Sequence, residues 1–187
     1  KQHLPTCDAI LFSDYHTGLL TPSLVNAIQA IADDITLTAD AQGELAKYSG
    51  FTLVKCNADE AQDYLQRDLH TDEDFGLAAT SLLEQLQLTG GMAITRGADG
   101  ITIATASGSV IHAPAPSVSD VYDTVGAGDT TIAVLTLALA GGLTYHVAAD
   151  LANYASGLVV RRVGNYTPSP TELINAIKNG VNYVEPT

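Results

Sequence analysis

Short apolar runs, each bounded by polar or glycine-containing stretches, recur along the chain and predict strands. Residues 8–14, 34–40, 51–56 and 91–97 each contain such a run, with a length typical of strands. Apolar and polar positions alternate through residues 100–113, and the small polar residues at 106–108 interrupt the pattern, which predicts a hairpin. We expect the first of these runs, "DAILFSD", to be a buried strand.

Helices are predicted in the longer stretches between and after these strands. Thr21 can cap a helix over the stretch 21–33, and Pro22 suits its first position. A second helix is expected to begin after Asn57 and a third to cover about 72–88. Three further helical segments are expected near 127–140, 144–161 and 170–179. The segment from Ala127 is apolar almost all round, so we expect it to be buried.

The alternation of strands and helices predicts an α/β fold. Right-handed βαβ units give a mostly parallel sheet, and such sheets bind ligands at the carboxyl ends of their strands. The chain has 187 residues and contains no repeat, low-complexity stretch or clear linker, so a single domain over 1–187 is expected.

Charge and cysteine usage restrict the classes of partner. The formal net charge of −13 opposes binding to nucleic acid or to an anionic membrane, although it leaves room for a small anion in a local site. Cys7 and Cys56 lie far apart without metal-ligand spacing, which favours a reducing compartment, and we expect the cytoplasm. The apolar run 130–143 is too short for a membrane helix.

The stretch "DTVGAGD" at 123–129 combines two glycines and two carboxylates with the start of a helix. A helix N-terminus offers unpaired N–H groups, and glycine lets a bound group approach them closely. The stretch is therefore a candidate anion site with Asp129 beside it. Alternatively, Asp129 only favours the helix dipole and the glycines only form a tight turn.

Two longer stretches, "VYDTVGAGDTTIAVLTLALAGG" and "LANYASGLVVRRVGNYTPSP", go beyond these local patterns. Through them the chain resembles the ribokinase-like, or PfkB, carbohydrate kinases, in particular the heptose 7-phosphate kinase domain of ADP-heptose synthesis. Three further stretches, "FSDYHTG", "TADAQG" and "VKCNADE", resemble the family motifs SDYGKG, DPKG and TPNxxE, and "ITRGADG" resembles a T-x-G-x-x-G strand and turn. The implied fold is a ribokinase-like three-layer α/β/α arrangement whose N-terminal part and lid are absent here.

The resemblance implies ATP-dependent phosphorylation of a sugar or sugar-phosphate hydroxyl, with a heptose 7-phosphate type of acceptor. Asp129 would be the catalytic base, and the amides of Gly126, Ala127 and Gly128 would form an anion hole. Thr95, Gly97 and Gly100 would line the ATP site, with Asn153 near the adenine. From local pattern alone, "TRGADG" is a strand with a turn into a hairpin, and Asn153 is a polar helix position.

Asn57 and Glu60 also have two interpretations. Asn57 is a good N-cap and Glu60 follows three residues later, so together they resemble a capping box. In the family these positions lie near Mg²⁺ and the ATP phosphates, often through water, and their oxygen atoms suit Mg²⁺. We expect both roles, because a capped helix end also faces the ligand edge of the sheet.

The chain departs from the family motifs at several positions. His16 and Thr17 replace the glycine and lysine of SDYGKG, Gln42 replaces the lysine of DPKG, and Lys55 is gained before Asn57. The family's N-terminal part, which supplies the first strands and most of the sugar pocket, has no counterpart. A partner chain, a second copy of the chain or an N-terminal segment would cover the exposed first strand.

Two other functions are compatible with parts of the pattern. A non-catalytic nucleotide-binding or interaction module derived from the kinase fold would fit the missing sugar half and the altered lysines, whereas the intact "GAGD" at 126–129 argues against it. A Rossmann-like oxidoreductase is disfavoured, because no G-x-G-x-x-G follows an early strand with an acid about twenty residues on.

Overall fold

The computed structural model describes residues 6–32 and 34–182. Six strands form one sheet in chain order, and the first four are parallel to one another, whereas β5 and β6 each run antiparallel to the strand before. The strands are β1 (Ala9–Asp14), β2 (Thr36–Ala41), β3 (Leu53–Asn57), β4 (Gly91–Thr95), β5 (Ile101–Thr105) and β6 (Val110–Ala113). The prediction of a mostly parallel α/β sheet ending in a hairpin is confirmed.

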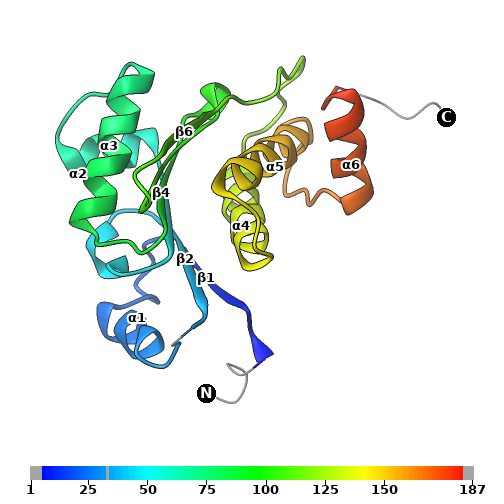
Figure 1. The fold of residues 1–187 in the computed structure, drawn as a ribbon. Coiled ribbons are helices and arrows are strands. Elements are labelled where there is room, and N and C mark those ends of the chain that lie inside the picture. The colour runs from blue at the N-terminus through cyan, green and yellow to red at the C-terminus, as the bar shows by residue number, and fades with distance from the viewer. Residues whose placement is uncertain (1–5, 33, 183–187) are drawn as a thin grey trace.

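Helices cover both faces of this sheet, which gives three layers (Figure 1). One face carries α1 (Pro22–Gln29), α2 (Ala58–Leu65) and α3 (Asp72–Gln85), and the other carries α4 (Ala127–Ala140) and α5 (Tyr145–Val159). The last helix, α6 (Pro170–Asn179), packs on the outside of α5. Two short 3-10 turns, η2 (Leu45–Tyr48) and η3 (Gly97–Asp99), lie in the connections.

Local capping explains where several helices begin. The Thr21 hydroxyl accepts from the N–H of Leu24, with Pro22 at the first helical position, as predicted. Thr71 and Ser169 each form a reciprocal capping box with an acidic side chain three residues later. The first helix ends earlier than the predicted stretch 21–33, at Gln29, and residue 33 lies outside the described residues.

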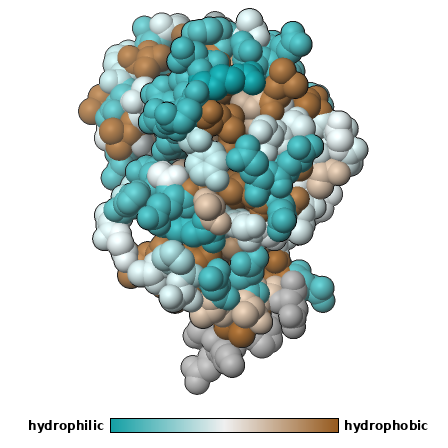
Figure 2. Space-filling view, turned by 90° about the vertical axis from the view of Figure 1, so that its left-hand side faces the viewer, coloured by the Kyte–Doolittle hydropathy of each residue, from teal (hydrophilic) through white to brown (hydrophobic). Residues whose placement is uncertain are grey.

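Two apolar cores lie on the opposite faces of the sheet. The larger fills the space between the sheet and α1–α3, where the rings of Phe12, Tyr48 and Phe51 pack with centroids 5.1–6.2 Å apart. The smaller lies between the sheet and α4–α5, around Ile132 and Leu135. The outer surface of α1–α3 intersperses hydrophilic and hydrophobic residues (Figure 2).

Two burial predictions were wrong in detail. The strand β1 was expected to be buried, but only Phe12 and Asp14 of it are, because β1 is an edge strand with β2 as its single neighbour in the sheet. The helix α4, which is apolar almost all round, was expected to be buried, but its Leu137 is 73% exposed. The reason is that α4 packs against α5, β1 and β2, and its outer side faces away from these elements.

None of the helices among the described residues combines the length and apolar character that a membrane span requires.

Candidate active site

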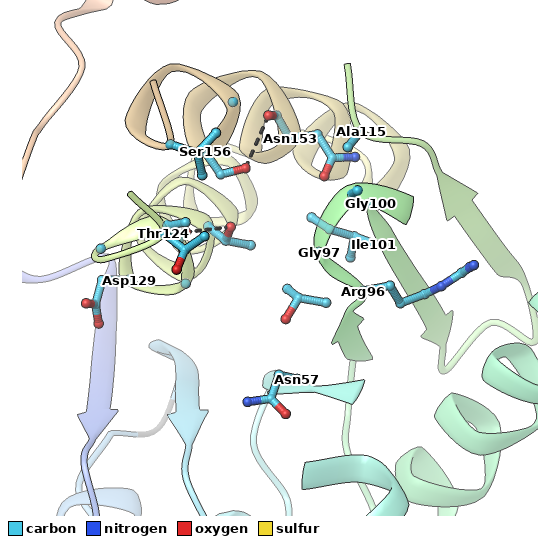
Figure 3. A pocket seen from close by; sticks show the side chains of 18 of the residues that line it. Asn57, Arg96, Gly97, Gly100, Ile101, Ala115, Thr124, Asp129, Asn153 and Ser156 are labelled. Atoms are coloured by element: carbon cyan, nitrogen blue, oxygen red, sulfur yellow. Dashed lines mark hydrogen bonds between the residues drawn. The ribbon is translucent and has the colours of Figure 1, made fainter. Parts of the chain in front are cut away.

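A cavity of ≈ 1130 Å³ lies at the carboxyl ends of the parallel strands. Its walls come from the residues that end β1–β4, the turn before β5, the loop at 115–126 and the first turn of α4, and α5 closes one side. This is the edge at which parallel α/β sheets bind ligands. Figure 3 shows Asp129 toward one end of the cavity and Gly100, Ile101 and Asn153 toward the other.

Asp129 lies in the first turn of α4 and faces the cavity. Its Oδ1 accepts a hydrogen bond from the Tyr15 hydroxyl at 2.6 Å and a longer one from Ser13 at 3.5 Å. The hydrogen bond to Asp129 raises the pKa of Tyr15, because loss of the phenolic proton would place two negative charges together. Asp129 is thus an exposed carboxylate held on one side and open on the other.

The predicted anion hole lies at the start of α4. Gly126 is the N-cap residue with φ 82°, a left-handed conformation that glycine adopts readily, and no side chain caps the helix. The N–H of Ala127 donates to the carbonyl of Thr124 at 3.2 Å, so it is already engaged. The structure therefore leaves Gly126 and Gly128, rather than all three amides, as the open part of this helix end.

Asp123 at the start of the motif has a different position. Its two carboxylate oxygens accept from the backbone N–H groups of Val125 and Gly164, each at 3.0 Å. These bonds lower the pKa of Asp123, because they stabilise its ionised form. Asp123 ties the loop before α4 to the loop after α5 and is not among the cavity-lining residues.

Lys55 and Asp40 form a buried ion pair in the wall of the cavity. The ammonium group of Lys55 lies 2.9 Å from both carboxylate oxygens of Asp40, and both side chains are less than 10% exposed. Burial raises the pKa of Asp40, the Lys55 charge opposes this, and the Asp129 carboxylate adds to the increase. Two positions of the altered motifs are therefore direct partners: Lys55, which is gained before Asn57, and Asp40, the first residue of the DPKG counterpart.

Asn57 and Glu60 form the predicted capping box at the start of α2. Asn57 Oδ1 accepts from the N–H of Glu60 at 2.8 Å, and Glu60 Oε2 accepts from the N–H of Asn57 at 2.7 Å. Asn57 lines the cavity, whereas Glu60 is not among the lining residues. Burial raises the pKa of Glu60, partly offset by its hydrogen bond to Asn57 and by Lys55.

Asn57 and Glu60 fit a magnesium ion only if the ion is bound together with the phosphates of a nucleotide. The described residues contain no group of three or more histidine, cysteine or acidic side chains that could hold a metal ion by themselves. Mg²⁺ usually keeps several waters and takes one or two protein oxygens together with substrate phosphates. Asn57 and Glu60 supply oxygens of that kind beside the cavity.

Thr95, Gly97 and Gly100, which the resemblance assigns to the ATP site, come together at the end of β4 and line the cavity. Gly100 has φ 88°, and a Cβ there would lie 2.1 Å from the carbonyl oxygen of Ala113. The position thus requires glycine, because the end of β6 lies directly against it. The structure also agrees with the interpretation of this stretch as a hairpin turn, since β4 and β5 are antiparallel. The cavity wall and the hairpin turn are the same piece of chain.

Asn153 is a buried residue of α5 that faces the cavity. Its Nδ2 donates to the carbonyls of Ala113 and Pro114 at 2.9 and 3.2 Å, so the side chain fixes the loop after β6 to the helix. Apolar side chains also line the cavity: Ile101, Pro116, Val118, Val121, Val125 and Val160. Apolar walls with a few polar groups are typical of small-molecule and cofactor sites.

The altered motifs pack against each other. His16 has φ 54°, a left-handed conformation that explains why glycine is usual at this position, and its Nδ1 lies 3.1 Å from the carbonyl of Gln42. A Cβ on Gly43 would lie 2.4 Å from that nitrogen. Thus His16 fills the space beside Gly43, where the two loops after β1 and β2 meet.

The sequence patterns did not assign roles to Tyr15 or to the valines that line the cavity. Tyr15 directly follows β1, so its place at the carboxyl edge was available from the strand prediction. The valines at 118, 121 and 125 lie in a loop without periodicity, and no local signal marks them.

The family model "pfkB family carbohydrate kinase" matches residues 26–172, most of the chain. The chain belongs to the pfkB family of carbohydrate kinases. The match includes β2–β6, α2–α5 and the whole cavity edge except the residues after β1.

Curated relatives extend this assignment. The chain is 39% identical over 173 residues to the "Bifunctional protein HldE" of Geobacter sulfurreducens, covering 91% of this chain and 35% of that protein. It is also 39% identical over 180 residues to the protein of the same name from Hyphomonas neptunium, covering 95% of this chain and 37% of that protein. The chain thus spans about a third of the length of these relatives.

Solved structures show the fold. The ribokinase of Arabidopsis thaliana complexed with ribose and ATP superimposes with a TM-score of 0.81 at 16% identity, covering 98% of this chain and 58% of that one. The phosphofructokinase-2 of Escherichia coli in complex with potassium gives a TM-score of 0.79 at 18% identity, covering 93% and 58% of the two chains. The ribokinase-like fold predicted from the sequence is confirmed.

Proposed function

We propose that this chain is the nucleotide-binding and catalytic part of a kinase that transfers the terminal phosphoryl group of ATP to a sugar or sugar-phosphate hydroxyl. The observation that carries the proposal is the placement of Asp129 beside the start of α4, which no side chain caps, in a cavity that apolar side chains also line. A base and an anion site lie together there, within reach of one bound nucleotide.

In this proposal Asp129 takes the proton of the acceptor hydroxyl. One carboxylate oxygen accepts from Tyr15, which leaves the other for the acceptor. The open N–H groups of Gly126 and Gly128 stabilise charge on the transferring phosphoryl group. Phosphoryl transfer needs positioning and charge stabilisation more than covalent chemistry. A carboxylate base and backbone N–H donors are groups of the kind that this reaction requires.

The cofactors follow from charge. Asp129 and Asp59 line the cavity, together with Asp40, whose charge is balanced by Lys55. A nucleotide polyphosphate would therefore meet repulsion from Asp129 and Asp59 unless a cation came with it. Mg²⁺ supplies that charge when it is bound with ATP. Asn57 and Glu60 would hold it, through water or directly. Thr95, Gly97 and Gly100 would contact the nucleotide, and Asn153 would lie near the adenine.

For the acceptor, we propose a heptose 7-phosphate type of sugar. The support is the resemblance of the sequence motifs to those of the heptose 7-phosphate kinase domain. The chain covers about a third of the relatives to which it is 39% identical. The sugar would approach from the β1 side, where Tyr15 and Asp129 meet. The reaction would take place in the cytoplasm, with a small-molecule partner and neither nucleic acid nor membrane.

A second candidate function is a nucleotide-binding module without catalysis. It is favoured by the loss of lysine at Thr17 and Gln42 and by the engaged N–H of Ala127. Such a module would bind ATP without acceptor-dependent turnover.

One experiment separates the two. ADP release from Mg²⁺–ATP is measured over a panel of sugars and sugar phosphates that includes heptose 7-phosphate, with this chain alone and with the chain joined to the N-terminal kinase part of a relative. We expect acceptor-dependent release to fall by at least about a hundredfold in Asp129→Asn, the low end of general-base contributions, with ATP still bound. Equal transfer by Asp129→Asn would rule out Asp129 as the base, and ATP binding without release in either protein would favour the module.

A further inference from the structure

Lys55 is a buried cation that reaches the wall of the cavity. Its side chain is 6% exposed, and its ammonium group donates to both oxygens of Asp40. An ammonium group has three N–H donors, so one donor remains beyond these two bonds. A charged lysine is seldom buried to this degree unless it is paired or has a ligand to bind.

The remaining N–H donor of Lys55 lies beside the first turn of α4. A Cβ placed on Gly128 would lie 3.2 Å from Lys55 Nζ and 3.9 Å from Asp40 Oδ2. The ammonium group and the first turn of α4 therefore border the same corner of the cavity, with Asp129 next along the helix. An anion against the open amides of α4 would lie within reach of Lys55.

Arg96 is the other strong cation in the cavity wall, and its Nη1 is already engaged, although its buried Nε has no hydrogen-bond partner among the described residues. The guanidinium lies 2.7 Å from Asp72, donates to Thr102 at 3.1 Å and stacks 4.5 Å from the ring centre of Phe75. Figure 3 shows its side chain directed away from the middle of the cavity. Among the described residues that line the cavity, Lys55 is thus the strong cation left for a ligand.

We propose that Lys55 binds the terminal phosphoryl group of ATP, with Asp40 holding its ammonium group in place. The inference rests on the proposed function and adds a further binding residue to that site. The chain has lost the lysine of the DPKG motif at Gln42 and carries Lys55 on the neighbouring strand instead. The positive charge has thereby moved from a loop to a buried position beside α4.

The proposal predicts discrimination between ATP and ADP. Lys55 would contact the phosphoryl group that ADP lacks, so it should strengthen binding of ATP and leave binding of ADP nearly unchanged. A hydrogen bond to a charged group corresponds to about a ten- to hundredfold change in dissociation constant.

The test is calorimetric binding of ADP and of a non-hydrolysable ATP analogue, both with Mg²⁺, to the full chain. Lys55→Met is combined with Asp40→Asn, because Lys55→Met alone would leave a buried charge without its partner. Asp40→Asn alone keeps Lys55, so it separates the effect of losing the lysine from the effect of losing the carboxylate. Lys178→Met removes the same charge from the exposed last turn of α6 and controls for the change in net charge.

We expect the wild type, Asp40→Asn and Lys178→Met to bind the ATP analogue more tightly than ADP. The double variant should lose this preference by about ten- to hundredfold through weaker binding of the ATP analogue alone. A double variant that keeps the wild-type preference would overturn the role of Lys55 while leaving the proposed function intact. A wild-type chain that binds neither nucleotide would overturn both.

Discussion

At the scale of single residues, the contact between Tyr15 and Asp129 joins the first strand to the first turn of α4. The two residues are 114 positions apart, and their side chains meet at 2.6 Å. Because Tyr15 donates to Oδ1, the carboxylate is held in one orientation with Oδ2 directed elsewhere. Tyr15 is a positioning residue in the proposed reaction, since it acts through Asp129.

We predict that Tyr15→Phe lowers kcat about tenfold in the chain joined to a relative's N-terminal kinase part, with little change in the KM for ATP. The reason is that phenylalanine keeps the ring and removes the donor that orients Asp129, a bond of the charge-assisted class. Steady-state kinetics at saturating acceptor would measure both constants. Tyr64→Phe on α2, outside the cavity lining, is the matched control; an unchanged kcat in Tyr15→Phe would contradict the positioning role.

Which site residues could be predicted depended on whether their signal was local. The glycines and Asp129 at 126–129 and the pair Asn57 and Glu60 belong to motifs, and the structure brings all of these except Glu60 into the cavity wall. The ion pair between Lys55 and Asp40 could not be predicted, because it joins side chains of two neighbouring strands and depends on their register. The same holds for the bond between Ala127 N–H and Thr124, which is a detail of loop geometry.

At the scale of elements, α6 is held at its start by two interactions of one carboxylate. Glu172 accepts from the backbone and hydroxyl of Ser169 in a capping box, and its other oxygen accepts from the Tyr166 hydroxyl. The hydrogen bond from Tyr166, followed by those from Ser169, lowers the pKa of Glu172 to about 2 from an ordinary value of 4.5. The ionised carboxylate therefore fastens α6 to the loop before it.

This shift predicts a pH dependence. A carboxylate with a depressed pKa in the folded state stabilises the fold fully above its unfolded pKa and loses that contribution as the pH falls through the folded pKa. We expect Glu172→Gln to be less stable than the wild type at pH 6 and the difference to shrink between about pH 4.5 and pH 2. Urea unfolding at a series of pH values measures it; a difference that stays constant down to pH 2 would contradict the assignment. Glu73→Gln on α3 serves as a control, because its position is exposed.

Element boundaries were predictable wherever a cap or a turn marks them. The ranges 127–140 and 170–179 agree with α4 and α6, and the hairpin turns at residues 106–108 as expected. Burial was less predictable, since it depends on what lies beyond an element: β1 is at an edge, and Leu137 of α4 faces away from the sheet. The turn η2 carries no periodic pattern, and its place is fixed by Leu45 and Tyr48, which are fully buried in the core.

At the scale of the whole molecule, the sheet connects the two cores. Leu53 on β3 faces the core of α4 and α5, whereas the next residue, Val54, faces the core of α1–α3. On β4, Ala93 and its neighbours alternate in the same way. This alternation follows from the two-residue period of a strand. Loss of either core exposes one face of the same strands, so we expect the chain to behave as a single cooperative unit.

We therefore predict that Leu82→Ala in α3 and Leu135→Ala in α4 each lower the free energy of unfolding by about 2–5 kcal/mol within one shared transition. Both leucines are fully buried, one in each core. Leu137→Ala, two positions further along α4 and 73% exposed, is the matched control and should change stability by less than about 0.5 kcal/mol. Urea unfolding is followed by far-ultraviolet circular dichroism and by tyrosine fluorescence. For each variant, we expect the curves from the two probes to coincide. Two separated transitions, with only one displaced by each substitution, would mean that the helical layers unfold independently and that residues 1–187 do not form one cooperative domain.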